Sequence, residues 1–188
     1  MRRLPDPVRI LLISGSTRSG STNSAALRTA HAASVEGVET ELYDGLADLP
    51  VFNPDDDFDP LPAAVSALRE RIAAADGVLF CTPEYAGALP GSFKNLLDWT
   101  VGGPEMYEKP VAWLNVAAES RGGHADASLR TVLGYLHTDI VEPAQRRITV
   151  PHDAVGEDGL VVPANIRANL EQVLRAFADH VRGEADAC

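Results

Sequence analysis

Short apolar runs alternate along the chain with longer segments in which apolar positions recur every three or four residues. A continuous apolar run between turn signals is typical of a strand that is buried on both faces. Three such runs occur, at residues 8–14, 77–81 and 110–117. The half-polar run 39–43 predicts a strand near the edge of the sheet. Two short extended pieces, 139–142 and 148–150, predict one interrupted final strand.

The segments between these runs have the apolar spacing of amphipathic helices. The clearest is the last one, where Leu170, Val173 and Phe177 share one face. The predicted helices are 22–33, with Ser21 or Thr22 as its cap, and 63–75, 92–99, 125–136 and 166–181. Strand and helix alternate five times along the chain. This alternation predicts a doubly wound parallel α/β sheet with right-handed crossovers.

Length and charge limit the alternatives. A chain of 188 residues fits one domain with a full core, and we expect that domain to span 1–188, with a disordered leader at 1–7 and a tail at 183–188. The net charge of −11 argues against nucleic acid and membrane surfaces as partners, because both require basic patches. No apolar run approaches the ~20 residues that span a bilayer. Two cysteines form no disulfide framework, so we expect a cytoplasmic protein.

A hydroxyl-rich loop follows the first predicted strand and leads into a helix. Residues 14–22 carry six hydroxyl side chains, and Arg18 and Asn23 add a cation and an amide without any acid. Free N–H groups and the positive dipole end at the helix start suit such a loop to a phosphate. Ser21 stands where a nucleoside-triphosphate loop has lysine, and Thr17 replaces the second glycine of the dinucleotide fingerprint. The alternative is a polar turn that caps its own helix, although a cap needs no cation.

Two further loops follow predicted strands at the same edge of the sheet, where ligands of open parallel sheets bind. Residues 83–91 contain two prolines and two glycines, so we expect a stiff loop that presents Tyr85. The loop after the next strand offers Ser120 and the backbone amides of Gly122 and Gly123. Phosphate donors, a ring platform and amides near a pyrimidine edge are together what flavin mononucleotide (FMN) requires. The alternative for the second loop is an ordinary connection whose tyrosine packs on the body of the protein.

Other polar residues have plainer interpretations. The long loop predicted at 45–61 holds an acidic cluster that consists of Asp55, Asp56, Asp57 and Asp59. It lacks the set glycine and distal glutamate of a calcium loop, so we expect a solvated surface segment and no metal site. Cys81 ends a buried strand and is expected to be an inert thiol. Arg121 is expected to be solvated, with a contact to a nicotinamide-nucleotide phosphate as the alternative. His124 is expected to be a surface residue at a helix start, with donation to the flavin edge as the alternative.

On these motifs the sequence resembles the NADPH-dependent FMN reductase family from about residue 8 to residue 136. The shared motifs are Gly15-Ser16-Thr17-Arg18 with Ser21 and Asn23, Pro83-Glu84-Tyr85 with Pro90-Gly91-Ser92-Phe93-Lys94-Asn95-Leu96-Leu97-Asp98-Trp99, and Gly122-Gly123 ahead of Leu129-Arg130. The resemblance implies a flavodoxin-like three-layer sandwich, with a five-stranded parallel sheet in the order 2-1-3-4-5 and helices on both faces. It also implies that all three loops bind FMN: Ser16, Arg18, Ser21, Thr22 and Asn23 at the phosphate, Pro83, Glu84, Tyr85 and Ala86 along the isoalloxazine, largely through backbone, and Ser120, Gly122 and Gly123 at its far edge.

The function implied by the resemblance is an NAD(P)H-dependent flavoprotein oxidoreductase. Hydride passes from NADPH, or NADH, to FMN, and electrons then pass to FMN, a quinone or another small acceptor. Such a transfer needs alignment and exclusion of water more than acid–base groups, so no catalytic side chain is predicted and Tyr85 borders the ring. The alternative is a non-enzymatic FMN-binding electron carrier or redox-responsive module on the same fold.

The resemblance further implies a homodimer or homotetramer that forms through the region 92–108. Phe93, Leu97 and Trp99 offer more apolar surface than one short helix needs inside the protein. We therefore expect this helix to present a face to a partner subunit, which would link FMN binding to assembly.

Overall fold

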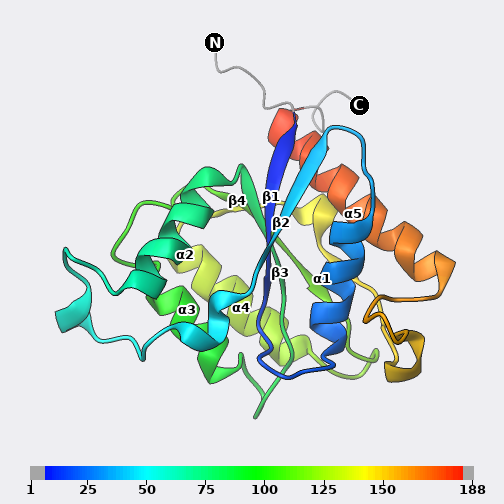
Figure 1. Ribbon diagram of the computed structural model, residues 1–188, viewed down its shortest axis with the longest axis horizontal. Helices are drawn as coiled ribbons and strands as arrows, with labels where there is room; N and C mark the ends of the chain where they lie inside the picture. The colour runs from blue at the N-terminus through cyan, green and yellow to red at the C-terminus, as the bar shows by residue number, and fades with distance from the viewer. Residues whose placement is uncertain (1–6, 184–188) are drawn as a thin grey trace.

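The computed structural model describes residues 7–183, in which a parallel sheet lies between two layers of helices (Figure 1). The strands are β1 (Val8–Ser14), β2 (Val38–Tyr43), β3 (Gly77–Cys81), β4 (Pro110–Asn115), β5 (Asp139–Ile140) and β6 (Arg146–Arg147). Their order is β2-β1-β3-β4-β5, with β6 also paired to β4. This order confirms the flavodoxin-like sheet and adds a short sixth strand. The predicted leader and tail lie outside the described residues, apart from Pro7 and Gly183 at their inner ends.

The final strand is interrupted, as predicted. β5 runs parallel to the start of β4, and β6 runs parallel to its end. A 3-10 turn, η3 (Glu142–Ala144), separates the two pieces. The ladder continues beyond β6, because the Ile148 amide donates to the Asn115 carbonyl at 2.9 Å. The second piece therefore begins two residues earlier than the sequence indicated.

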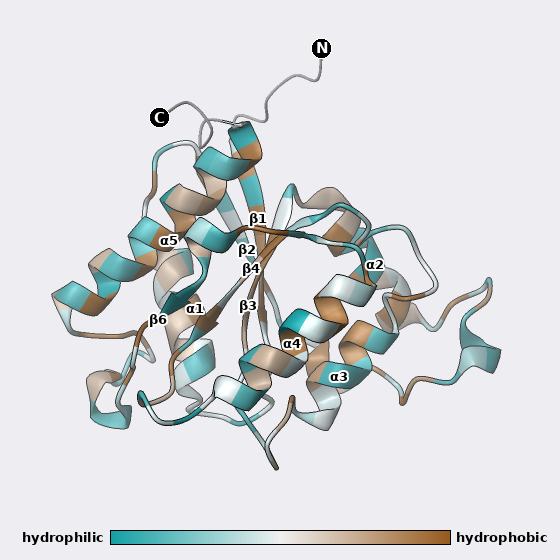
Figure 2. Cartoon of the chain, turned by 180° about the vertical axis from the view of Figure 1, so that it is seen from behind, coloured by the Kyte–Doolittle hydropathy of each residue, from teal (hydrophilic) through white to brown (hydrophobic). Residues whose placement is uncertain are grey.

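All five predicted helices are present, and their bounds differ from the predicted ones by at most two residues. They are α1 (Thr22–Ala32), α2 (Ala63–Ala74), α3 (Gly91–Asp98), α4 (Gly123–Tyr135) and α5 (Ala164–Arg182), with 3-10 turns η1 (Gly45–Asp48), η2 (Pro54–Asp56) and η4 (His152–Ala154). α1 and α5 cover one face of the sheet, and α2, α3 and α4 cover the other (Figure 1). Hydrophilic and hydrophobic residues alternate along α5, as expected of an amphipathic helix (Figure 2).

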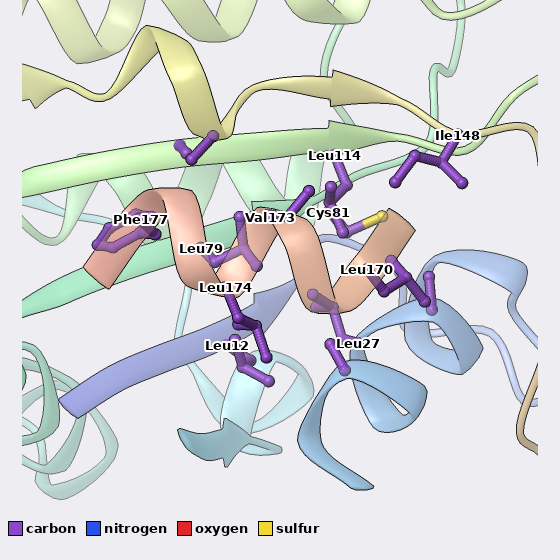
Figure 3. Packing of buried hydrophobic residues seen from close by; sticks show 14 of the residues in the cluster. Leu12, Leu27, Leu79, Cys81, Leu114, Ile148, Leu170, Val173, Leu174 and Phe177 are labelled. Atoms are coloured by element: carbon purple, nitrogen blue, oxygen red, sulfur yellow. The ribbon is translucent and has the colours of Figure 1, made fainter. Parts of the chain in front are cut away.

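Successive residues of the central strands point to opposite faces, and both faces are covered. Leu12 and Leu79 contribute to the cluster under α1 and α5, where Phe177 also lies (Figure 3). Leu11 and Phe80 contribute to the second cluster, under α2, α3 and α4. Because neither face meets water, polar residues have no place in these strands, which explains the continuous apolar runs of the sequence.

The apolar face of α3 is covered by this chain itself. Phe93, Leu97 and Trp99 are all fully buried. The segment before η2 folds back over the helix: the Phe52 ring meets Trp99 edge-on with 5.0 Å between the ring centroids, and the Pro50 carbonyl accepts the Trp99 indole N–H at 2.8 Å. The prediction that these three side chains present a face to a partner subunit is therefore wrong.

One residue of the acidic segment is less solvated than expected, whereas Asp55, Asp56 and Asp59 are exposed as predicted. Asp57 forms an ion pair with Arg69 at 2.6 Å, and the two side chains are only 12% and 10% exposed. Arg69 also donates to the Trp99 carbonyl at 2.9 Å, which ties the segment to the end of α3.

Within residues 7–183, no group of three His, Cys, Asp or Glu side chains is placed to hold a metal ion. In the same range, no helix combines the length and apolar character that a membrane span requires.

Candidate functional site

A cleft of about 440 Å³ opens at the carboxyl edge of the sheet, where the loops after β1, β3 and β4 gather (Figure 1). A fourth wall comes from the connection between β6 and α5. The cleft is lined by Ser16, Arg18, Ser21, Thr22, Asn23, Thr82, Pro83, Glu84, Tyr85, Val116, Ala117, Arg121, Gly122 and His152. Its size lies in the range of small-ligand and cofactor sites.

Nine of the predicted site residues meet in this cleft: Ser16, Arg18, Ser21, Thr22, Asn23, Pro83, Glu84, Tyr85 and Gly122. Three others do not line it. Ala86 lies at the exposed tip of a tight turn, Ser120 is exposed in the loop after β4, and Gly123 is the exposed first residue of α4. Loop composition indicated the segments that line this cleft, but it does not reveal which residues of a loop face inward.

The loop after β1 is held by its own hydroxyl groups. The Ser14 and Ser24 hydroxyls are 2.8 Å apart, and the Ser14 oxygen accepts the Ser16 amide at 3.3 Å. Ser21 caps α1, since its hydroxyl accepts the Ser24 amide at 3.4 Å. The first turn of α1 contains no acidic residue. The positive end of the helix dipole therefore faces the cleft without a neutralising side chain.

The loops after β1 and β3 touch each other directly. A Cβ atom at Gly15 would lie 2.3 Å from the Thr82 hydroxyl and 2.9 Å from the Phe93 ring. No residue with a side chain fits this crossing, so the close approach of the two loops depends on glycine. The contact sets the hydroxyl-rich loop against the Pro83–Tyr85 wall of the cleft.

Glu84 joins the second loop to the third. Its Oε2 atom accepts the amides of His124 at 2.8 Å and Ala125 at 3.0 Å. The N-cap residue of α4 is Gly122, which has no side chain to serve these amides. The Glu84 carboxylate therefore acts as the missing cap and is turned toward α4. This contact ties the loop after β3 to the start of α4.

Tyr85 stands at the open side of the cleft. Its amide and carbonyl are both bonded to Ala88, at 3.1 and 3.0 Å, which closes a tight turn with positive φ at Ala86 and Gly87. The Tyr85 side chain is 53% exposed. A rigid turn thus holds an aromatic ring at the rim, where a second flat molecule can reach it.

Arg147 fixes the loop after β4. Its Nη1 atom donates to the carbonyls of Ala118 at 3.2 Å and Arg121 at 2.8 Å, and lies 3.5 Å from that of Ala117. At the end of this loop Gly122 has φ +83°, and a Cβ atom there would lie 2.7 Å from the Asn115 side chain. One arginine and one glycine therefore determine the shape of this wall.

Five residues of the cleft were not predicted: Thr82, Val116, Ala117, Arg121 and His152. Arg121 was expected to be solvated, and it is exposed although it lines the cleft. His152 comes from η4, and its Nε2 atom contacts the Arg18 guanidinium. The rule that ligands bind after the carboxyl ends of strands identified the first three loops, and applied to the last strand it also points to His152.

Cys81 lies behind the cleft and takes no part in it. Its thiol is fully buried and donates to the Asn23 amide oxygen at 3.3 Å. Burial raises the pKa of the Cys81 thiol, because the apolar surroundings disfavour the thiolate. The neutral thiol is a poor nucleophile, which agrees with the inert role expected from the sequence.

The donor set of the cleft fits FMN. Arg18, the hydroxyls of the first loop and the α1 N-terminus are groups that can donate to a phosphate, and Pro83, Tyr85, Val116 and Ala117 give the same cleft an apolar lining. Anion donors and an apolar lining in one cleft, at this edge of a parallel sheet, are features of a flavodoxin-like flavoprotein.

Comparison with known proteins identifies the family. Residues 8–149 match the NADPH-dependent FMN reductase family, and the chain belongs to that family. It is 36% identical over 182 residues to the NAD(P)H-dependent FMN reductase of Pseudomonas aeruginosa, covering 95% of this chain and 98% of that protein. It is 28% identical over 184 residues to a quinone reductase of Escherichia coli K12, covering 95% and 98%.

Among solved structures, the flavoenzyme NAD(P)H:(acceptor) oxidoreductase of Paracoccus denitrificans matches with a TM-score of 0.79 and 27% identity. The match covers 94% of this chain and 98% of that one. The protein is accordingly an NAD(P)H-dependent flavoprotein oxidoreductase with FMN as its cofactor.

Proposed function

We propose that the cleft holds FMN between its three loops, and that the enzyme uses NAD(P)H to reduce small flat acceptors, quinones among them. The observation that carries the proposal is that one cleft is lined by Arg18, by the hydroxyl side chains of the first loop and by the half-exposed Tyr85 ring. A catalytic centre that binds a nicotinamide and a second substrate in turn needs such an open side.

In this proposal the hydroxyl-rich loop binds the phosphate. Arg18 supplies the cation, and Ser16, Ser21 and Thr22 supply hydroxyl donors around the N-terminus of α1. The protein carries a net charge of −11, so its overall field repels an anion. Local donors must therefore provide all of the attraction, and the loop concentrates them at one point.

The ring is proposed to lie between the backbone of Pro83–Tyr85 and the wall formed by Val116, Ala117 and Gly122. When bound, FMN supplies two-electron chemistry that accepts hydride from the nicotinamide and returns electrons to the acceptor. The chain's part is alignment: Glu84 ties one wall to α4, and Arg147 holds the other. Tyr85 borders the open side and limits how a flat substrate can approach.

Relatives support the acceptor class. A quinone reductase of Escherichia coli and an NADPH:quinone oxidoreductase of Arabidopsis thaliana, 28% and 29% identical to this chain, share nearly its whole length. The half-exposed Tyr85 ring beside small residues at positions 86–88 suits stacking with a flat apolar molecule.

The test is anaerobic mixing of the FMN-loaded protein with NADPH or NADH, followed by a water-soluble benzoquinone. We expect the visible flavin absorbance to bleach with at least one nucleotide and to return when the quinone is added. An unbleached spectrum with both nucleotides would contradict the reductase activity. Bleaching that only oxygen or added free FMN reverses would contradict quinones as acceptors.

Assembly and location stay predictions. We propose that the protein forms a homodimer or homotetramer through the region 92–108, in which Val101 and Tyr107 are 65% and 61% exposed. Light scattering after gel filtration of Val101→Asp and Tyr107→Asp variants tests this, since a monomeric wild-type protein would exclude it. A cytoplasmic site of action is tested by cell fractionation.

A further inference from the structure

We propose that His152 is a further phosphate-binding residue, which closes the cleft over the FMN phosphate together with Arg18. The inference rests on the proposed function and extends it to a segment that the sequence did not connect with the site. His152 stands 134 residues beyond Arg18 in the chain, yet its Nε2 atom contacts the Arg18 guanidinium. Both side chains line the same cleft.

The segment that carries His152 is anchored to the helix that forms the phosphate site. The connection between β6 and α5 turns back on itself through a bridge between Val155 and Val161. The Val161 amide donates to the buried Thr29 hydroxyl of α1 at 2.8 Å, and that hydroxyl donates to the Ala25 carbonyl at 2.7 Å. This connection, yellow to orange in Figure 1, runs beside α1. His152 is thus held in a fixed place relative to the N-terminus of α1.

The Arg18–His152 contact lacks a carboxylate. A guanidinium can only donate, so this contact gives Arg18 no negative charge. The other hydrogen bond of the Arg18 guanidinium, to the Gly20 carbonyl, is long at 3.5 Å. Glu84 is the one acidic residue that lines the cleft, and its carboxylate is bonded to the α4 amides. Among the residues that line this cleft, none therefore gives the pair a counterion.

A phosphate supplies the negative charge that the Arg18–His152 pair lacks. Arginine always carries its charge, and an imidazole ring always has at least one N–H group that donates to an anion. Two such groups beside hydroxyls and a helix N-terminus make a stronger anion site than the first loop alone. The slot near Pro83 and Val116 is apolar and gives the histidine no comparable partner. The geometry therefore assigns His152 to the phosphate rather than to the ring.

The test compares FMN with riboflavin, which has the same ring and no phosphate. Apo-protein is titrated with each flavin, and binding is followed by quenching of flavin fluorescence. We expect His152→Ala to weaken FMN binding about ten-fold, the size of one hydrogen bond to a charged group, and to leave riboflavin binding unchanged. His152→Gln keeps a donor near the same place and should recover part of the loss.

His31→Ala is the matched control, because this exposed histidine contacts Thr40 and lies outside the cleft. Circular dichroism of each variant verifies the fold. Wild-type FMN affinity in both His152 variants would overturn the inference, and so would equal losses of FMN and riboflavin affinity. If FMN binding in this cleft is wrong, the result differs from these outcomes, because the wild-type protein itself would bind neither flavin or would bind both equally.

Discussion

The Glu84 carboxylate provides a direct test of how the site is assembled. It joins two walls of the cleft, because a residue of the loop after β3 accepts the His124 and Ala125 amides of α4 at 2.8 and 3.0 Å. Replacing Glu84 with alanine removes the acceptor and its charge, whereas replacing it with glutamine keeps an acceptor oxygen and removes only the charge. The two variants therefore separate the hydrogen bonds from the helix-dipole interaction.

The magnitude follows from the α4 geometry. The N-cap is Gly122, so no other side chain replaces the lost acceptor. A lost cap costs about 1 kcal/mol, and a lost negative charge at a helix N-terminus costs about 0.3–1 kcal/mol. We expect Glu84→Ala to destabilise the protein by about 1.5–2 kcal/mol, and Glu84→Gln by about 0.5–1 kcal/mol. For a chain of this length, the alanine variant should unfold about 5 °C below the wild type.

The assay is thermal unfolding of the apo-protein by circular dichroism, paired with hydrogen exchange at the start of α4. Glu119→Gln is the matched control, because Glu119 is an exposed acid on the neighbouring loop. We expect faster exchange of the His124 and Ala125 amides in Glu84→Ala and no change in the control. Unfolding temperatures that are equal in wild type and Glu84→Ala would refute the capping role.

Four further predictions follow from single contacts. Arg18→Ala should weaken FMN binding at least ten-fold with the fold intact, since it removes the cation from the phosphate loop. Arg147→Ala should weaken FMN binding about ten-fold by releasing three loop carbonyls, whereas Arg146→Ala, with one local bond, should not. Gly122→Ala should destabilise the protein by about 2–3 kcal/mol, because its φ is +83° and the new Cβ meets Asn115. Burial raises the pKa of Tyr43 to about 12, and its hydroxyl has no partner, so Tyr43→Phe should stabilise the protein by up to about 1 kcal/mol.

The buried Tyr43 phenol also predicts the direction in which the stability of the protein changes with pH. Because burial raises the pKa of Tyr43 from its usual value near 10 to about 12, the unfolded chain loses this proton first, and the protein becomes less stable as the pH rises from about 10 to 12. Urea unfolding at pH 8 and pH 11 measures this loss, which the Tyr43→Phe variant should lack. Equal pH dependence in both proteins would contradict the buried, unpaired phenol.

The flavin titrations described for His152 also measure the arginine variants. An Arg18→Ala protein with unchanged FMN affinity would show that the phosphate lies elsewhere. Equal effects of Arg147→Ala and Arg146→Ala would contradict the loop clamp. A Gly122→Ala protein as stable as the wild type would mean that the loop after β4 can relax around an added methyl group.

The sequence predicted most of the fold because its elements are strongly periodic. Central strands buried on both faces leave continuous apolar runs, and α5 leaves a regular apolar stripe. The way in which Trp99 is buried could not be predicted from periodicity. Periodicity indicates that a face is buried, but not what buries it, and here a segment without any periodic pattern, around Phe52, covers the helix.

The candidate site was predictable to the level of loops. The position of each loop follows from the strand before it, so Arg18 and Tyr85 were expected at the same edge of the sheet. The direction of each side chain depends on local turns: the Tyr85–Ala88 turn carries Ala86 to an exposed tip, away from the cleft. The strand-end rule also points to the segment after the last strand, but the contact of His152 with Arg18 depends on tertiary hydrogen bonds such as Val161 to Thr29, which the sequence does not reveal.

A crystal structure of the protein with FMN would show whether this cleft holds the cofactor. We expect a phosphate within hydrogen-bonding distance of Arg18, Ser21 and His152, and a ring between Pro83–Tyr85 and the Val116–Gly122 wall. A second cleft lies on the other side of the hydroxyl-rich loop, against Tyr43 and Leu46. Density for FMN in that second cleft, or a phosphate away from the N-terminus of α1, would contradict the account.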